Sequence, residues 1–295
     1  MTIATCYISP EGIVLGADST TTYSLDEGNH YFNHAQKLFE IGEESTLGIV
    51  TWGLGSLVDQ SYRTLVANLA DQFIKALPAT VEAAANAWID LFWDAYRNSA
   101  VVGPALQEVQ LLDKKASHDP ANPGAIGMRS EAEEKQYNVL RSTLVVGFCI
   151  AGYVPTDRTP HAFEIIFDPL GTKPAPVAIV GTQRFWGAPN MINRLLIGMD
   201  DPLFDSIMNS GHWNGTNTDL LAIVQQHAIS HPILPIRDAI DFTHACITST
   251  IKALKFSNFS QICGGPVEIA LITTDRKFRW VRHKPWDTAI TEGAI

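Results

Sequence analysis

The chain has 295 residues, 46% of them hydrophobic, so it is long enough to bury a substantial core and is expected to be globular. Lysine and arginine number 21 against 31 aspartate and glutamate residues, which gives a formal net charge of -10, and no segment concentrates basic side chains. This balance argues against a nucleic-acid partner. The sequence has no secretion signal and no apolar run of ~18 residues, which predicts a cytoplasmic protein that neither spans nor binds a membrane.

Cysteine and histidine usage predicts no metal and no cofactor. The four cysteines lie singly in apolar segments, at positions 6, 149, 246 and 263, which fits buried, reduced thiols better than disulfides. His227 and His231 are one helical turn apart, but the spacing places no third ligand beside them. Surface or capping histidines are therefore the preferred interpretation.

The first 22 residues are typical of a β-hairpin. Residues 2–8 and 13–17 are β-branched, aromatic or small, and Ser-Pro-Glu-Gly between them is turn chemistry. If the turn centres between Pro10 and Glu11, antiparallel pairing places Thr2 opposite Asp18 and Ser19. A carboxylate is then expected close to the start of the chain.

This placement predicts chemistry if Met1 is removed. Thr2 would then carry both a hydroxyl nucleophile and a free α-amine, and an α-amine titrates near ~8 in model peptides, close enough to neutrality to serve as a base. The alternative is an ordinary edge strand that follows a start codon, since hairpins are far more often structural than catalytic.

Two further strands follow a polar segment, residues 19–33, that is predicted to be a loop. They span 36–41 and 46–52 around a Gly-Glu-Glu turn. In the first strand Lys37 shares a face with Phe39 and Ile41, so it is expected to point toward the core. The alternative is a lysine at the strand edge that extends to solvent.

The remaining chain alternates between blocks of helices and blocks of strands. A helix with its apolar stripe from Val58 to Phe73 and a second helix over 79–98 precede a mixed segment, 103–135, that we interpret as an insertion with an exposed loop at 117–124. Further strands are predicted at 144–152, 162–167 and 176–181, helices at 189–197, 201–209, 219–230 and 236–255, and a closing hairpin at 266–273 and 277–281. Such blocks favour an α+β fold with antiparallel sheets. We expect residues 1–295 to form a single domain, a four-layer αββα sandwich of two sheets with helices outside.

With these elements in place, the sequence resembles proteasome β-type subunits and the HslV-type peptidase, members of the N-terminal nucleophile (Ntn) hydrolase family. The match at the front has no gaps and comprises Thr2, Gly12, Asp18, Ser19 and Thr22. Lys37 matches the family's active-site lysine, Gly53 its oxyanion-hole glycine, and Gly264-Gly265 its late glycine pair. The resemblance implies the Ntn-hydrolase fold.

The resemblance also implies a mechanism of acyl transfer. The Thr2 hydroxyl would attack an amide, the Thr2 amine would take its proton, and an acyl-enzyme would then be hydrolysed. Lys37, paired with Asp18, would lower the pKa of the amine and of the hydroxyl by its positive charge, and the Gly53 amide would hold the oxyanion. Residues Thr21, Thr51 and Trp52 would border the substrate pocket.

One supporting carboxylate of the family is missing. Where the family has an aspartate and a serine before the late glycine pair, this chain has Ser260 and Cys263, and the family's other supporting serine falls at Thr182. The resemblance therefore leaves room for a different amide substrate or for a degenerate site.

The first functional hypothesis is a threonine peptidase that assembles into a homo-oligomeric ring or ring-like assembly and acts on a peptide or an unfolded protein. Whether an unfoldase supplies the substrate is not indicated. The second hypothesis is a non-catalytic structural ring subunit of the same fold, in which Asp18 and Lys37 form a buried ion pair. The third is a small-amide hydrolase that uses the same nucleophile.

Overall fold

The computed structural model describes residues 2–25, 28–122, 126–258 and 262–284. The chain divides into two compact units. The first comprises Met1–Lys37, Thr182–Leu271 and Arg279–Ile295, and the second comprises Leu38–Gly181 and Ile272–Phe278. The single domain over 1–295 stays a prediction.

The first unit is built on a five-stranded sheet with the order β10-β1-β2-β11-β12. The strands are β1 (Ile3–Ser9), β2 (Gly12–Ala17), β10 (Gln183–Gly187), β11 (Glu268–Thr273) and β12 (Arg276–Arg282), of which the tip of the β11–β12 hairpin groups with the second unit. In the β1–β2 hairpin Ser9 lies opposite Gly12 and Ala4 opposite Ala17, which confirms the predicted turn at Pro10 and Glu11.

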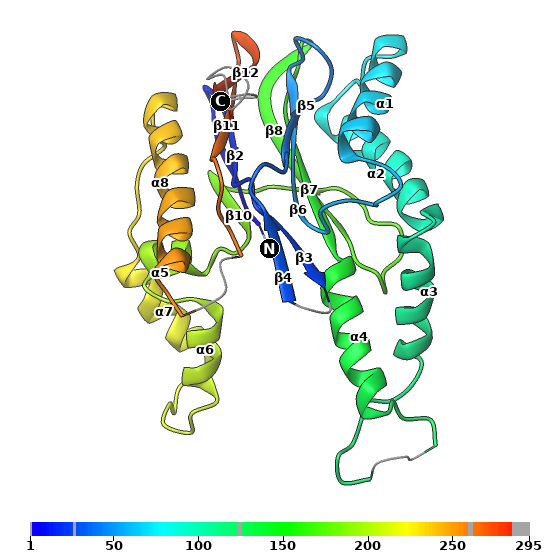
Figure 1. The fold of residues 1–295 in the computed structure, drawn as a ribbon. Coiled ribbons are helices and arrows are strands. Elements are labelled where there is room, and N and C mark those ends of the chain that lie inside the picture. Colours follow the sequence, from blue (N-terminus) through cyan, green and yellow to red (C-terminus); the bar gives the residue numbers. More distant parts are fainter. Residues whose placement is uncertain (1, 26–27, 123–125, 259–261, 285–295) are drawn as a thin grey trace, which may run out of the picture. The chain divides into compact units, whose positions relative to one another are not determined.

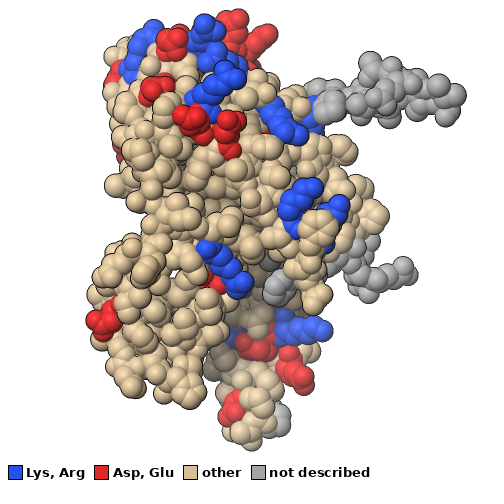
Figure 2. All heavy atoms as spheres, turned by 90° about the vertical axis from the view of Figure 1, so that its left-hand side faces the viewer, with Lys and Arg blue, Asp and Glu red and all other residues tan. Residues whose placement is uncertain are grey.

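Four helices belong to the first unit (Figure 1): α5 (Asn190–Ile197), α6 (Asp201–Met208), α7 (Asn217–His227) and α8 (Ile236–Lys255). The long helix α8 packs on β1 and β2, and α5 packs on α8. The predicted end of α5 at Gly198 is confirmed, since this residue adopts φ +80°. The face that carries these helices has a broad area without charged side chains (Figure 2). Correspondingly, Asp219 is the one charged residue between 206 and 236.

Two predictions for the first unit were wrong. The segment 19–33 is not a loop throughout, because β3 (Thr21–Leu25) and β4 (Gly28–Phe32) form a two-stranded antiparallel ribbon. A ribbon outside the sheets needs no apolar face, so polar residues are tolerated and the periodicity signal is lost. The strand β10 was also missed, since its five residues, Gln-Arg-Phe-Trp-Gly, do not alternate between apolar and polar.

The second unit contains a five-stranded sheet with the order β5-β6-β7-β8-β9. Its strands are β5 (Leu38–Glu40), β6 (Leu47–Gly53), β7 (Val146–Val154), β8 (Asp157–Phe167) and β9 (Val177–Ala178). Its helices are α1 (Tyr62–Lys75), α2 (Val81–Asn98), α3 (Val102–Asp113) and α4 (Glu131–Leu144). Helix α2 packs on β7 and β8, and its Phe92 ring lies 4.7 Å from those of both Phe148 and Phe167, at the centre of an aromatic core.

Helix α1 begins four residues later than its apolar stripe suggested. Val58 is exposed and adopts φ +71°, outside any helix, and Ser61 caps α1 by accepting a hydrogen bond from the Thr64 N–H. Because a hydroxyl at this position satisfies one of the free N–H groups of the first turn, it decides where the helix starts.

The segment 103–135 is more regular than predicted. Helix α3 occupies most of its first half and buries Leu106, Val109 and Leu112, and α4 occupies its end. The buried Arg129 joins the two helices, since its guanidinium donates to the Leu112 carbonyl and pairs with Glu134. Whether this segment is an insertion stays a prediction.

The pairings β1–β10 and β1–β2 of the first sheet and all four pairings of the second are antiparallel. Eight helices accompany the two sheets in the described residues, which confirms the predicted α+β class. None of the described helices has both the length and the apolar character needed to cross a membrane.

We predict that substitutions in α1 separate its buried stripe from its exposed face. Leu69 is 0% exposed and Ile74 is 82% exposed. Leu69→Ala is expected to lower the free energy of unfolding by ~2–5 kcal/mol, because it removes apolar contacts and leaves a cavity. The control Ile74→Ala is expected to change it by no more than ~0.5 kcal/mol. Urea denaturation measures both, and similar losses would contradict the packing of α1 described here.

Candidate active site

The buried carboxylate of Asp18 forms the centre of the candidate site. Its Oδ1 accepts hydrogen bonds from the Ile3 N–H at 3.1 Å and from the Lys37 ammonium at 2.6 Å. Its Oδ2 accepts from the N–H groups of Thr20 at 3.2 Å and Gly264 at 2.9 Å. These donors come from separate parts of the first unit, so one carboxylate joins the start of β1, the end of β2, the segment before β5 and the segment before β11.

Lys37 points inward, as the alternation with Phe39 and Ile41 predicted. Its side chain is buried and forms an ion pair with Asp18. A buried ammonium is costly unless it is paired, and Asp18 supplies that partner. The alternative, a lysine that extends to solvent, is therefore wrong.

Thr2 directly precedes Ile3, whose backbone forms two hydrogen bonds with Asp18. The Ile3 N–H donates to the Asp18 side chain, and the Ile3 carbonyl accepts from the Asp18 N–H at 3.1 Å. Thr2 itself is buried. The pairing of the hairpin thus continues to Ile3 and Asp18, and the residues Thr2, Asp18 and Lys37 lie at this end of the sheet.

The loop that leads into β11 closes this end of the sheet. The Ser19 N–H donates to the Gly264 carbonyl at 3.0 Å, and the Ser19 hydroxyl donates to the Pro266 carbonyl at 2.7 Å. Cys263 is buried beside them, and burial, followed by the negative charge of Asp18, raises the pKa of its thiol to about 12. A thiol with this pKa is protonated at neutral pH and is neither a nucleophile nor a charged support.

A second buried carboxylate lies in the same unit and was not predicted. Glu268, in β11, is fully buried and pairs with His283 at 2.8 Å and with Lys284 at 3.4 Å. The Lys284 ammonium also donates to the Ala35 carbonyl at 3.0 Å, two residues before Lys37. The sequence signal was available, because a single glutamate in an otherwise apolar strand predicts a buried, paired charge.

Three of the predicted residues, Thr51, Trp52 and Gly53, belong to the second unit. The Thr51 hydroxyl donates to the Gly147 carbonyl at 3.1 Å, and the Trp52 ring lies against Gly147, where a Cβ would come within 2.1 Å of it. Gly53 ends β6 with φ +84°. A Cβ at Gly53 would lie 2.3 Å from the Val145 carbonyl oxygen, so this position requires glycine.

Three other predicted residues lie outside the cluster or outside the described residues. Thr21 is half-buried at the start of β3, opposite Phe32. The carbonyl of Thr182 accepts from the Ile8 N–H at 2.7 Å, so Thr182 lies at the turn end of β1 and the structure does not bring it to Thr2. With a rise of ~3.3 Å per residue, the two are separated by most of the length of a strand. Ser260 lies outside the described residues.

His231, one of the two histidines considered as metal ligands, contacts a backbone carbonyl and a tyrosine ring. His231 Nδ1 contacts the Pro232 carbonyl at 2.8 Å, and its ring stacks on Tyr7 with a centroid distance of 6.2 Å. Within the described residues, no group of three or more histidine, cysteine, aspartate or glutamate side chains is arranged to hold a metal ion.

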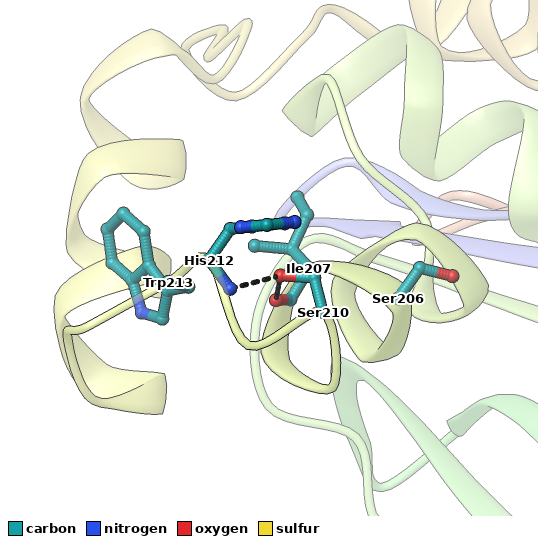
Figure 3. A pocket seen from close by; sticks show the side chains of 5 residues that line it. All are labelled: Ser206, Ile207, Ser210, His212 and Trp213. Atoms are coloured by element: carbon teal, nitrogen blue, oxygen red, sulfur yellow. Dashed lines mark hydrogen bonds between the residues drawn. The ribbon is translucent and has the colours of Figure 1, made fainter.

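An open hollow of about 380 Å³ lies at the end of α6 and is lined by Ser206, Ile207, Ser210, His212 and Trp213 (Figure 3). The His212 N–H donates to the Ser210 hydroxyl at 3.1 Å, and the Trp213 indole donates to the Thr216 carbonyl at 3.4 Å. None of the predicted site residues lines this hollow, so it lends no support to the Thr2 site.

We predict that Lys37→Met destabilises the protein by ~3–5 kcal/mol, because it leaves the buried Asp18 charge without its cation. The matched control is Lys277→Met, which removes an ammonium from an exposed pair with Glu44 and is expected to change stability little. Chemical denaturation of both variants tests this. Equal effects of the two substitutions would contradict a structural role for the buried pair.

We also predict that Cys263 resists alkylation in the native protein. At pH 8 its thiol, with a pKa of about 12, is almost fully protonated, whereas in the unfolded chain it returns toward 9.0. Iodoacetamide followed by mass spectrometry should show Cys263 unmodified until urea is added. As the pH rises, the Cys263 thiol loses its proton at a lower pH in the unfolded chain than in the native protein. The raised pKa therefore lowers the free energy of unfolding as the pH rises from 9 to 12. Rapid labelling of the native protein at Cys263 would contradict the assignment.

Comparison with known proteins supports the fold. No family model matches the sequence, and no curated protein matches it. Among solved structures, the chain is similar to Anbu from Hyphomicrobium sp. strain MC1, with 9% identity and a TM-score of 0.50 over 99% of this chain and 94% of that one. It also matches Anbu from Yersinia bercovieri, described as an ancestral beta-subunit, with 12% identity and a TM-score of 0.45 over 100% of this chain and 93% of that one. At 9% identity the first likeness shows the fold alone, so the chain shares with Anbu the α+β fold described above.

Proposed function

We propose that the protein is a threonine-type N-terminal nucleophile hydrolase that cleaves amide bonds of peptides or unfolded proteins. The observation that carries the proposal is the buried ion pair of Asp18 and Lys37. The Asp18 oxygen that accepts from Lys37 also accepts a hydrogen bond from the N–H of Ile3, the residue after Thr2. The Lys37 ammonium and the backbone that follows Thr2 share this carboxylate, which supports a role for Lys37 close to the Thr2 hydroxyl. The nucleophile is complete once the residue before Thr2 has been removed.

The proposed reaction has two halves. The Thr2 hydroxyl oxygen bonds to the carbonyl carbon of the amide, and its proton passes to the Thr2 amine. The amine returns that proton to the leaving nitrogen as the C–N bond breaks, which leaves an ester on Thr2. Water then attacks the ester with the same amine as base, which releases the acid and restores the hydroxyl.

In this mechanism the charged pair has two tasks. The Lys37 ammonium favours the neutral form of a nearby amine, which lowers the pKa of that amine toward the working pH. Asp18 keeps Lys37 and the backbone of β1 in place. The sequence resemblance assigns the oxyanion donor to the Gly53 N–H, a contribution worth ~3 kcal/mol where single donors have been removed. It assigns the border of the substrate pocket to Thr21, Thr51 and Trp52, and these assignments stay predictions.

The resemblance of the sequence to proteasome β-type subunits favours a homo-oligomeric ring or ring-like assembly for this chain. An assembly of this kind would confine the site and restrict it to extended or unfolded substrates.

A second candidate function is that of a non-catalytic subunit. The observation that favours it is the complete set of four donors around Asp18, which is also what a purely structural buried charge requires. In that case Thr2 would only begin a strand, and its hydroxyl would be dispensable.

The experiment that tests the proposal combines the identity of the N-terminus with substitutions of Thr2. We expect protein from its native host to begin at Thr2 by intact mass and N-terminal sequencing. Thr2→Ala should abolish hydrolysis in a screen of peptide and small-amide substrates, because it removes the nucleophile, whereas Thr2→Ser should retain part of it. Both variants should assemble as the wild type does.

Two outcomes would count against the proposal. A native protein that keeps a residue before Thr2 has no free Thr2 amine and would support the non-catalytic alternative. Hydrolysis that survives Thr2→Ala would show that another group is the nucleophile. Hydrolysis confined to small amides would keep the nucleophile and change the substrate class.

A further inference from the structure

We propose that Gly187 is a positioning residue for Thr2, an inference that rests on the proposed function. Gly187 is the last residue of β10, which runs antiparallel to β1 with Gly187 opposite Ile3. The strand therefore passes the start of β1 at this glycine. No other residue of β10 is paired so close to Thr2.

The backbone of Thr2 occupies the space where a side chain at position 187 would lie. A Cβ at Gly187 would be 1.8 Å from the Thr2 carbonyl oxygen, 2.8 Å from its carbonyl carbon and 3.5 Å from its Cα. These are main-chain atoms directly before β1, so they cannot swing aside as the end of a flexible side chain can. Gly187 also adopts φ +81°, which side chains disfavour.

The peptide group between Thr2 and Ile3 is thus held on both of its edges. Its carbonyl oxygen lies against Gly187, and its N–H donates to Asp18 Oδ1 at 3.1 Å. Because the C=O and N–H of a planar peptide group point in opposite directions, these two contacts limit the shift of the group along that direction. The Cα of Thr2 is attached to that plane, so its hydroxyl and its amine are positioned with it.

A methyl group at position 187 would displace the Thr2 carbonyl by more than ~1 Å or break the pairing with Asp18, since carbon and oxygen atoms need ~3.3 Å between them. A misplacement of ~1 Å can cost ~100-fold in rate when the reacting groups are otherwise intact. The loss should appear in kcat, because substrate contacts elsewhere on the protein are unchanged.

The test compares Gly187→Ala with Gly198→Ala. Gly198 has nearly the same φ, +80°, but nothing lies within 4 Å of a Cβ there. Both variants carry the strain of a left-handed alanine, whereas only Gly187→Ala pushes on Thr2. We expect kcat to fall ~100-fold in Gly187→Ala, with KM within ~3-fold of wild type, and to be unchanged in Gly198→Ala.

A third variant, Gly187→Asn, separates strain from collision, because asparagine tolerates the left-handed backbone and still has a Cβ. It should lose kcat as Gly187→Ala does. Rates are normalised to the folded fraction from denaturation curves. Retained kcat in either Gly187 variant would overturn the inference, and so would failure of both to fold while Gly198→Ala folds, since Gly187 would then serve the fold and not Thr2.

The outcomes distinguish this inference from the proposed function. A wild-type protein without hydrolysis that depends on Thr2 overturns both. A wild-type protein that hydrolyses amides through Thr2, together with an equally active Gly187→Ala variant, overturns the positioning role and leaves the proposed function standing.

Discussion

The first unit depends on how it satisfies one buried negative charge. An ionised carboxylate removed from water is strongly destabilising unless donors and a cation surround it. Asp18 meets this requirement with three backbone N–H groups and the Lys37 ammonium. The donors are up to 246 residues away in sequence, so the charge is satisfied only when distant segments have reached their native positions. Because Asp18 needs all of these donors at hydrogen-bond distance, the positions of the segments that supply them are closely defined.

The segment before Lys37 is held by two contacts, one of which comes from a second buried charge. The Ala35 N–H donates to the Ser19 carbonyl at 2.9 Å, and the Ala35 carbonyl accepts from Lys284, which is itself paired with Glu268. The two carboxylates therefore stabilise the same backbone segment. Asp18 binds the ammonium of Lys37, and Glu268 binds Lys284, which holds the backbone at Ala35. A lysine side chain has four rotatable bonds, so anchoring its backbone as well as its ammonium removes much of the freedom that would blur the position of its charge.

The sequence predicted those parts of the site that follow from local rules. In a hairpin with a two-residue turn, residues at equal distances from the turn are paired, so the partners can be found by counting along the sequence. This rule correctly placed Asp18 beside the start of β1. Alternation along a strand correctly turned Lys37 inward. The failures share a different cause. The position of Thr182 was taken from its alignment near a glycine, but the structure inserts strand β10 after it and carries the chain along β1 before it reaches Thr2. Glu268 and Gly187 act through contacts with residues far away in sequence, which neither periodicity nor turn chemistry reports.

The conformation of residue 187 bears on the choice between a catalytic and a structural hairpin. Glycine supplies no side chain to pack and weakens a strand, so a glycine in an edge strand such as β10 often marks a close approach of another backbone. Here a left-handed glycine allows β10 to approach the Thr2 carbonyl more closely than any other residue would permit. Close approach of two backbones at a strand end is useful when the position of the terminal residue matters. The four donors around Asp18 suit either role, but the combination of that carboxylate on one edge of the Thr2–Ile3 peptide and Gly187 on the other favours a residue whose hydroxyl must be held in place.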